Sequence, residues 1–115
     1  MVVRQHETER VDRVFGALAD PTRRDIVVRV LRQEASVSAL AAAYAMSFAA
    51  VQKHVAVLER AGLVTKERRG REQLVRGDVD TVRAASRLLA SYEQIWRGRI
   101  ARMDQVLAES LPERS

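Results

Sequence analysis

The 115-residue chain contains no cysteine, and its aromatic residues are limited to two phenylalanines, two tyrosines and one tryptophan. Without cysteine there are no disulfides, no thiol catalysis and no thiolate metal sites. No apolar run approaches the ~20 residues that a membrane span needs. The charged N-terminal residues also do not fit a signal peptide. The sequence therefore predicts a cytoplasmic protein with no membrane partner.

Sequence motifs of common enzymes are missing as well. The chain has no glycine-rich phosphate loop and no H-E-x-x-H metalloprotease motif. Serines lie near His54 only in sequence, which is common by chance. We therefore predict no enzymatic activity, no catalytic residue and no cofactor.

The composition that is present indicates one globular domain. Hydrophobic residues make up 47% of the chain and charged residues 30%, which is typical of a folded rather than a disordered protein. The formal net charge is +5 and the sequence pI is about 10.6. Such a balance favours nucleic acid or another anionic surface as a partner.

Two helices are predicted in the first third of the chain. Asp20 is suited to cap the second of them, with Pro21 in its first position. Arg23 and Arg24 could contact phosphate, or form salt bridges with Asp20, Glu34 or another helix. Apolar residues recur at helical spacing in both segments, first at Val11, Val14, Phe15 and Leu18, and then at Ile26, Val27, Val30 and Leu31.

The next two segments have the pattern of a helix-turn-helix. Ser38 is a plausible cap for a short helix over 39–44, and Ser47 for a longer one over 47–61. About three residues join these helices, as in helix-turn-helix motifs. Gly62 is suited to end the second helix, because glycine adopts a left-handed conformation at little cost. Its inward stripe consists of Val51, Val55 and Leu58.

A basic hairpin is predicted after this helix. Short runs at 63–65 and 73–75 flank the turn Arg68-Arg69-Gly70-Arg71, where Gly70 supplies the positive φ. Between Lys53 and Arg76 there are seven lysines and arginines and three glutamates, so this stretch carries +4 of the net +5. Concentrated positive charge favours a binding patch over a generally solvated surface.

The last helix is expected to run from about 80 to 108, with Asp78 or Asp80 as its cap. At 1.5 Å per residue it would be ~42 Å long, longer than a domain of this size is wide. Part of its apolar stripe would then lack a partner in its own chain, unless the helix folds back across its core. We predict a homodimer through this helix and the first one, with contacts from Val11, Phe15, Leu89, Tyr92, Trp96, Ile100 and Met103.

Together these patterns predict a mainly α protein with a small β-hairpin. A flexible arm is expected at 1–8, a winged helix-turn-helix domain at 9–108 and a flexible tail at 109–115.

The chain resembles the ArsR/SmtB family of bacterial winged helix-turn-helix regulators. The matching segments are ALADPTRRDIV, SVSALAAAYAMSFAAVQKHVAVLERAGLV, ERRGRE and, in one cysteine-free subgroup, YEQIWRGRIARMDQVL. The resemblance implies helices in the order α-α-α-α, then a β-wing and a final α-helix, in a homodimer. It also implies binding of double-stranded DNA at an imperfect palindromic promoter operator, usually as a repressor and often of the protein's own operon.

The DNA-reading helix of the family corresponds to 47–61. Gln52 could pair with an adenine edge and Lys53 with guanine or phosphate. Family members commonly have serine at the position of Gln52, so base preference is expected to differ. Arg71 is expected to enter the minor groove. The residues predicted to contact DNA are Ser47, Ala49, Ala50, Gln52, Lys53, His54, Arg68, Arg69 and Arg71.

Metal sensing is not expected. Metal-sensing relatives carry paired cysteines near the positions of Ala41–Ala43, or Asp/His and His/Glu pairs in the last helix. Here the third helix reads ALAAAY and the last helix has no histidine. His54 matches a family histidine near the DNA backbone, so we favour a phosphate contact or an internal hydrogen bond over a metal ligand. The sequence does not reveal an effector.

Two functions follow from these residues. The first is a sequence-specific regulator with the helix 47–61 in the major groove and the wing 66–73 on the minor groove or backbone. The alternative is a winged-helix protein-interaction module with only nonspecific DNA affinity, which would be expected to lack such a concentrated basic hairpin.

Overall fold

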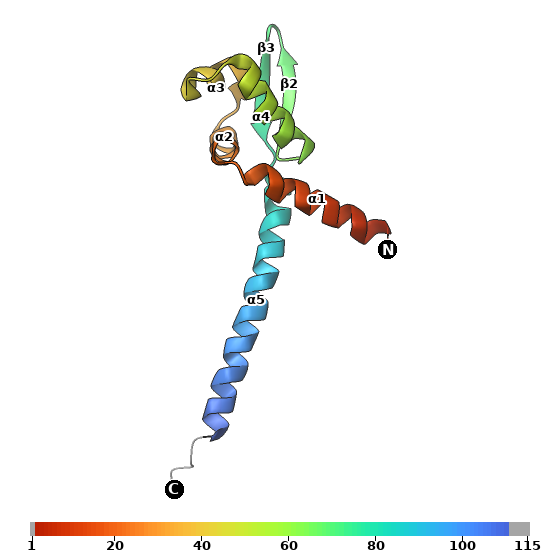
Figure 1. The fold of residues 1–115 in the computed structure, drawn as a ribbon, viewed down its shortest axis with the longest axis vertical. Coiled ribbons are helices and arrows are strands. Elements are labelled where there is room, and N and C mark those ends of the chain that lie inside the picture. Colours follow the sequence, from red (N-terminus) through yellow and green to blue (C-terminus); the bar gives the residue numbers. More distant parts are fainter. Residues whose placement is uncertain (1, 111–115) are drawn as a thin grey trace. The chain divides into compact units, whose positions relative to one another are not determined.

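The computed structural model describes residues 2–110, with side chains from residue 8 onward. The chain divides into two compact units, residues 1–83 and residues 84–115, and each is described by itself. The first unit holds four helices, a small sheet and the start of a fifth helix. The second unit is the remainder of that last helix (Figure 1). No helix among the described residues is long and apolar enough to cross a membrane.

Helices α1 (Val2–Leu18) and α2 (Pro21–Arg32) open the first unit. Helix α1 begins at Val2 and therefore covers most of the arm expected at 1–8, because no proline or glycine there interrupts a helix. The predicted cap of α2 is confirmed: the Asp20 carboxylate accepts a hydrogen bond from the Arg23 N–H at 2.9 Å, and Pro21 occupies the first position.

The helix-turn-helix consists of α3 (Val37–Tyr44) and α4 (Phe48–Arg60). The prediction of Ser38 as the cap of α3 was wrong. Ser36 has the extended backbone of a cap, and its Oγ accepts from the Ala39 N–H at 3.0 Å, so the helix starts two residues earlier. Ser47 caps α4 as predicted, since its Oγ accepts from the Ala50 N–H at 3.1 Å.

The sheet has three strands rather than the predicted two. Strands β2 (Val64–Arg69) and β3 (Glu72–Gly77) form the expected antiparallel hairpin, and Gly70 in its turn has φ of 64°. A two-residue strand, β1 (Ala35–Ser36), pairs with the other edge of β3. Two residues are too few to show an alternating pattern, so β1 left no signal in the sequence.

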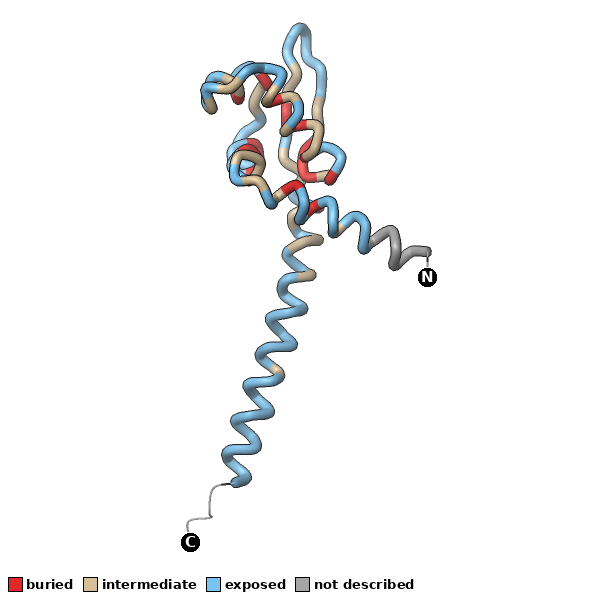
Figure 2. The backbone as a smooth tube through the Cα atoms, viewed as in Figure 1, coloured by how far each residue is buried: buried red, intermediate tan, exposed pale blue. Residues whose placement is uncertain are grey.

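The core of the first unit lies where α2, α3 and α4 meet the sheet, as the buried segments in Figure 2 show. The predicted inward stripe of α4 is confirmed, because its three residues are fully buried. On α2, Ile26, Val27 and Val30 are buried, whereas Leu31 of the same apolar stripe is 40% exposed. The largest fully buried side chains are Ile26, Val37, Leu40, Val51, Val55, Leu58, Leu63, Val64 and Val75.

Helix α5 (Val79–Ser110) extends slightly beyond the expected 80–108 and is about 48 Å long at 1.5 Å per residue. Asp78 caps it, as its Oδ1 accepts from the N–H groups of Asp80 and Thr81. Residues 109 and 110 of the expected tail are helical, and 111–115 lie outside the described residues. Large apolar side chains of α5 are exposed, including Leu89, Tyr92, Ile95, Trp96, Ile100, Met103, Val106 and Leu107.

Candidate nucleic-acid interface

The first turns of α4 present short and polar side chains to solvent. Because Val51 and Val55 are buried, Ala49 and Lys53 face outward and are exposed. Ala50 is half-buried on the flank of this face. Short side chains let a helix approach a groove closely, while Lys53 supplies a cation that can reach a base edge or a phosphate.

Gln52 is also on this helix but contacts the hairpin. Its Nε2 donates a hydrogen bond to Oε1 of Gln73 in β3 at 3.1 Å, and both residues are half-buried. Gln73 could not be predicted from the sequence, because 21 positions separate the two residues. The contact ties α4 to the hairpin and holds the Gln52 amide in one orientation.

His54 is half-buried and lies near the start of α2. The pKa of the Asp20 carboxyl is lowered, first by the hydrogen bond from the Arg23 N–H and to a smaller extent by the charge of His54. His54 is therefore close enough to Asp20 to act on its carboxyl electrostatically. Within the described residues no group of three or more His, Cys, Asp or Glu side chains could hold a metal ion.

Arg23 and Arg24 form no salt bridge with Asp20, Glu34 or another helix among the described residues, and donate instead to backbone oxygens of α1. Arg23 Nε donates to the carbonyl oxygen of Ala17 at 2.7 Å, and Arg24 donates to that of Leu18 at 2.7 Å. Both carbonyls lie in the last turn of α1, which has no basic residue of its own. The two arginines thus satisfy orphan carbonyls at the C-terminus of α1 and favour its dipole.

A polar cluster holds the end of α3 against α2. The hydroxyl of Tyr44 donates to Asp25 Oδ2, and Arg29 Nε donates to the same oxygen at 3.1 Å. The Arg29 guanidinium also lies 5.0 Å from the centre of the Tyr44 ring. These contacts fix α3, and hence the turn that leads into α4, and they were not foreseen because 19 residues separate Tyr44 from Asp25.

Four charged side chains form an ion-pair network at the hairpin. Arg69 lies 3.6 Å from Glu34 and 3.3 Å from Glu67, and Arg76 contacts the same two glutamates. The Arg76 guanidinium lowers the pKa of the Glu34 carboxyl. Two of the hairpin's cations are therefore neutralised in place, and the network joins β2 and β3 to the residue that precedes β1.

Arg68 and Arg71 remain at the tip, on either side of Gly70. Both are exposed, and neither forms an ion pair within the part of the chain that the structure describes. Arg68 makes only a long hydrogen bond of 3.4 Å to the Gly70 carbonyl oxygen. The unpaired positive charge of the hairpin is thus concentrated at its tip, in the first unit that also carries the exposed face of α4.

Comparisons with known proteins agree with this geometry. A family model for a helix-turn-helix domain matches residues 18–67. An ArsR-like transcriptional regulator from Rhodococcus sp. RHA1 is 32% identical, with 92% of this chain and 99% of that chain covered and a TM-score of 0.77. Another ArsR family transcriptional regulator is 32% identical over 78% of this chain and 93% of its own, with a TM-score of 0.73.

A third solved structure is the homodimeric winged helix-turn-helix DNA-binding domain of a possible ArsR-family regulator from Mycobacterium bovis. It is 26% identical, covers 79% of this chain and 85% of its own, and has a TM-score of 0.66. No curated protein matches the chain.

A capped helix-turn-helix followed by a basic hairpin defines a winged helix-turn-helix protein. The chain belongs to the ArsR family of transcriptional regulators, which confirms the resemblance inferred from its sequence.

Proposed function

We propose that this protein is a homodimeric repressor that binds an imperfect palindrome in a promoter. Members of the family often bind the promoter of their own operon, and that promoter is the first candidate here. Helix α4 would enter the major groove and the wing at 66–73 would lie on the minor groove or backbone. The observation that carries the proposal is the pairing of an exposed, short-chained face on α4 with unpaired cations at the wing tip. Such a surface offers base contacts and phosphate contacts together.

In this proposal the predicted DNA-contacting residues have different tasks. Ala49, Ala50 and Lys53 face the bases, and Arg68 and Arg71 contact phosphate or the minor groove. Ser47 holds the helix start and offers its N-terminal N–H groups to phosphate.

The remaining members act partly through other residues. Gln52 contacts a base while Gln73 orients its amide group. His54 lies beside the DNA backbone. Arg69 chiefly positions the wing through Glu34 and Glu67.

Dimerisation supplies the second half-site contact. The Mycobacterium bovis relative is homodimeric, and the predicted contact residues Leu89, Tyr92 and Trp96 are exposed on α5. A contiguous stripe of exposed apolar side chains on a helix is typical of a protein interface. Of the predicted contacts on α1, Phe15 is 36% exposed and Val11 is half-buried.

The decisive experiment is a mobility shift on the protein's own upstream promoter DNA over a salt series, with and without excess nonspecific competitor. A shifted band that survives competitor supports sequence-specific binding and provides the fragment for footprinting. A promoter–reporter assay then tests repression. If the protein is a repressor, deletion of its gene should raise expression of the reporter. A band that competitor abolishes at every salt concentration would contradict the proposal and favour the protein-interaction module.

A further inference from the structure

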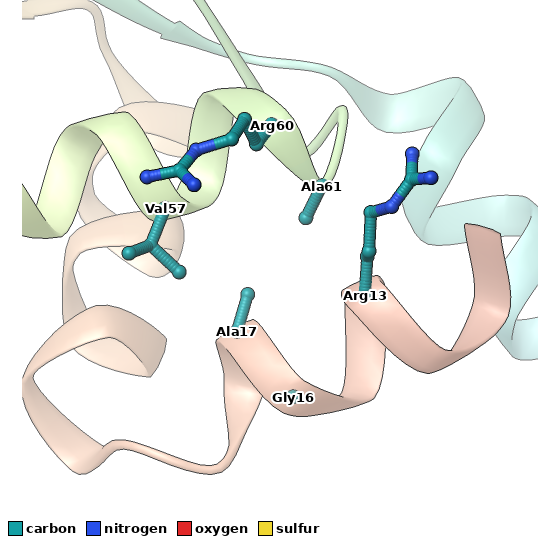
Figure 3. Close-up of a pocket in the computed structure, with 6 residues that line it drawn as sticks. All are labelled: Arg13, Gly16, Ala17, Val57, Arg60 and Ala61. Carbon is teal, nitrogen blue, oxygen red and sulfur yellow. The ribbon is translucent and has the colours of Figure 1, made fainter. Parts of the chain in front are cut away.

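A cavity of about 370 Å³ lies between the second half of α1 and the last turn of α4 (Figure 3). All its lining residues belong to the first unit: Arg13, Gly16, Ala17, Val57, Arg60 and Ala61. The volume falls within the range of roughly 300–1,000 Å³ that small-molecule sites occupy. None of these residues belongs to the surface proposed to contact DNA.

The floor of the cavity is apolar. Ala17 and Ala61 are almost fully buried, and in Figure 3 their methyl groups point into the space between the two helices, with Val57 beside them. Gly16 leaves further room, since a Cβ at this position would meet no atom within 4 Å. The space is therefore shaped for a small hydrocarbon group.

The polar part of the lining carries charge of one sign only. Arg13 comes from α1 and Arg60 from α4, and no carboxylate among the described side chains lines the cavity. The neighbouring Glu59 pairs with Lys66 at 3.4 Å, and Arg60 forms no ion pair among the described residues. Arg13 has only a long, exposed pair with Glu9 at 3.9 Å, which is worth little in water.

Arg60 lies in the last turn of α4, where a positive charge interacts favourably with the helix dipole. This interaction is enough to explain a cation at that position. It does not account for Arg13, which lines the same cavity from a different helix. Figure 3 shows the two guanidinium groups on opposite sides of the apolar floor. A carboxylate that carries a hydrocarbon tail could lie between them, because arginine pairs well with planar oxyanions.

We propose that this cavity binds an amphipathic monoanion, namely a carboxylate with a short aliphatic tail, between Arg13 and Arg60. Such a ligand would contact α1 and α4 at once. Its effect on DNA affinity, which rests on the proposed function, would come from a change in how these two helices pack. The binding itself does not depend on that function.

Calorimetric titration of the full chain with octanoate tests the binding. We expect saturable binding of octanoate, and at least tenfold weaker binding of butanoate because four methylene groups are removed from the apolar floor. Octylamine, which has the same number of carbon atoms but a positive head, should not bind. Equal binding of octylamine, or no binding of octanoate, would overturn the proposal.

Two variants locate the site. Arg60→Gln removes one guanidinium, and Gly16→Leu fills the apolar space from a position where a side chain meets no obstacle. Each should weaken octanoate binding at least tenfold while circular dichroism shows an unchanged fold. The matched control is Arg10→Gln, which removes an exposed arginine of α1 that does not line the cavity. Unchanged affinity in both cavity variants, or an equal loss in Arg10→Gln, would overturn the assignment.

A mobility shift with saturating octanoate separates the two proposals. A several-fold change in DNA affinity, absent in Gly16→Leu, supports regulation through this cavity. Octanoate binding with unchanged DNA affinity overturns the regulatory part alone. If the protein binds no DNA but still binds octanoate, the proposed function fails and the ligand site stands.

Discussion

Among the individual residues, Ala45 occupies an unfavourable backbone conformation. It has φ of 52° and ψ of 41° at the end of α3, in the turn of the helix-turn-helix, and no other described non-glycine residue has positive φ. A side chain raises the energy of the left-handed region by roughly 1–2 kcal/mol. This conformation redirects the chain from α3 into Ser47, the cap of α4.

Ala45→Gly is therefore expected to stabilise the protein by about 0.5–1 kcal/mol, since the relief of strain exceeds the added entropy of the unfolded chain. Urea denaturation at one protein concentration measures the difference. Gly70→Ala is the matched control, because Gly70 has φ of 64° and open space around its Cβ position. It should destabilise by a similar amount. Loss of stability in Ala45→Gly would show that the alanine methyl makes a contact that outweighs the strain.

Tyr44 gives a second prediction for a single residue, through its protonation. Partial burial, followed by the hydrogen bond to Asp25, raises the pKa of Tyr44 from 10.0 to about 12. A raised pKa in the folded state means that the neutral hydroxyl stabilises the fold fully below pH 10. This stabilisation then disappears as the pH rises toward about 12.

Phenolate absorbance in a pH titration should show one tyrosine ionising near pH 12, and that phase should vanish in Tyr44→Phe. Asp25→Asn should lower the midpoint only in part, because burial is the larger cause of the shift. If Tyr44 of the unaltered protein ionises with a midpoint near pH 10.0, the Tyr44–Asp25 contact does not persist in solution.

Among the secondary-structure elements, the wing carries two kinds of arginine, those held in ion pairs and those that form no ion pair among the described residues. Arg69 and Arg76 share Glu34 and Glu67, whereas Arg68 and Arg71 form no ion pair within the described residues. The four arginines carry the same charge, but the two in ion pairs are already partly neutralised. The other two offer more positive charge to a polyanion. Glu34 and Glu67 hold the paired cations in place, and in the proposed function Arg68 and Arg71 would displace counterions from DNA.

Arg71→Ala is expected to reduce the slope of log K against log salt by about 0.9 for each phosphate that is no longer neutralised, and Arg68→Ala likewise. Arg69→Ala should change this slope less, because its charge is already neutralised, and should instead lower the thermal stability of the hairpin. Salt series of fluorescence anisotropy with operator DNA measure the slopes. A larger reduction of slope for Arg69→Ala than for Arg71→Ala would contradict this division.

For the molecule as a whole, the important surface is the apolar stripe of α5, which we propose as the dimer contact. Trp96 is 56% exposed within one chain, with the Arg99 guanidinium 5.7 Å from its ring centre. Leaving such side chains in water is unfavourable, so a second copy of α5 would gain from covering them.

Trp96→Ala should weaken the dimer by roughly 3–5 kcal/mol if the interface buries the indole, because burial is removed and a cavity remains. Sedimentation equilibrium measures the dissociation constant. Phe48→Ala removes a comparably exposed aromatic from the start of α4 and should leave the dimer unchanged. A tight dimer in Trp96→Ala would place the interface elsewhere than on this stripe.

Features that depend on residues a few positions apart could be predicted from the amino-acid sequence alone. The Asp20 and Ser47 caps, the buried stripe of α4 and the positive φ of Gly70 each follow from local hydrogen bonding or helical spacing. The order of helices and hairpin could be predicted in the same way. The family could be predicted only because several segments resemble motifs of a known family.

Contacts between side chains that are distant in the sequence depend on the tertiary structure. No local sequence pattern determines them. Gln52 and Gln73 are 21 positions apart, and Glu34 and Arg76 are 42 apart. Such contacts depend on how packed helices and paired strands place the backbone, so no local pattern predicts them. For the same reason the folded chain revealed that Arg69 is paired while Arg71 forms no ion pair among the described residues, and that Arg13 and Arg60 line one cavity.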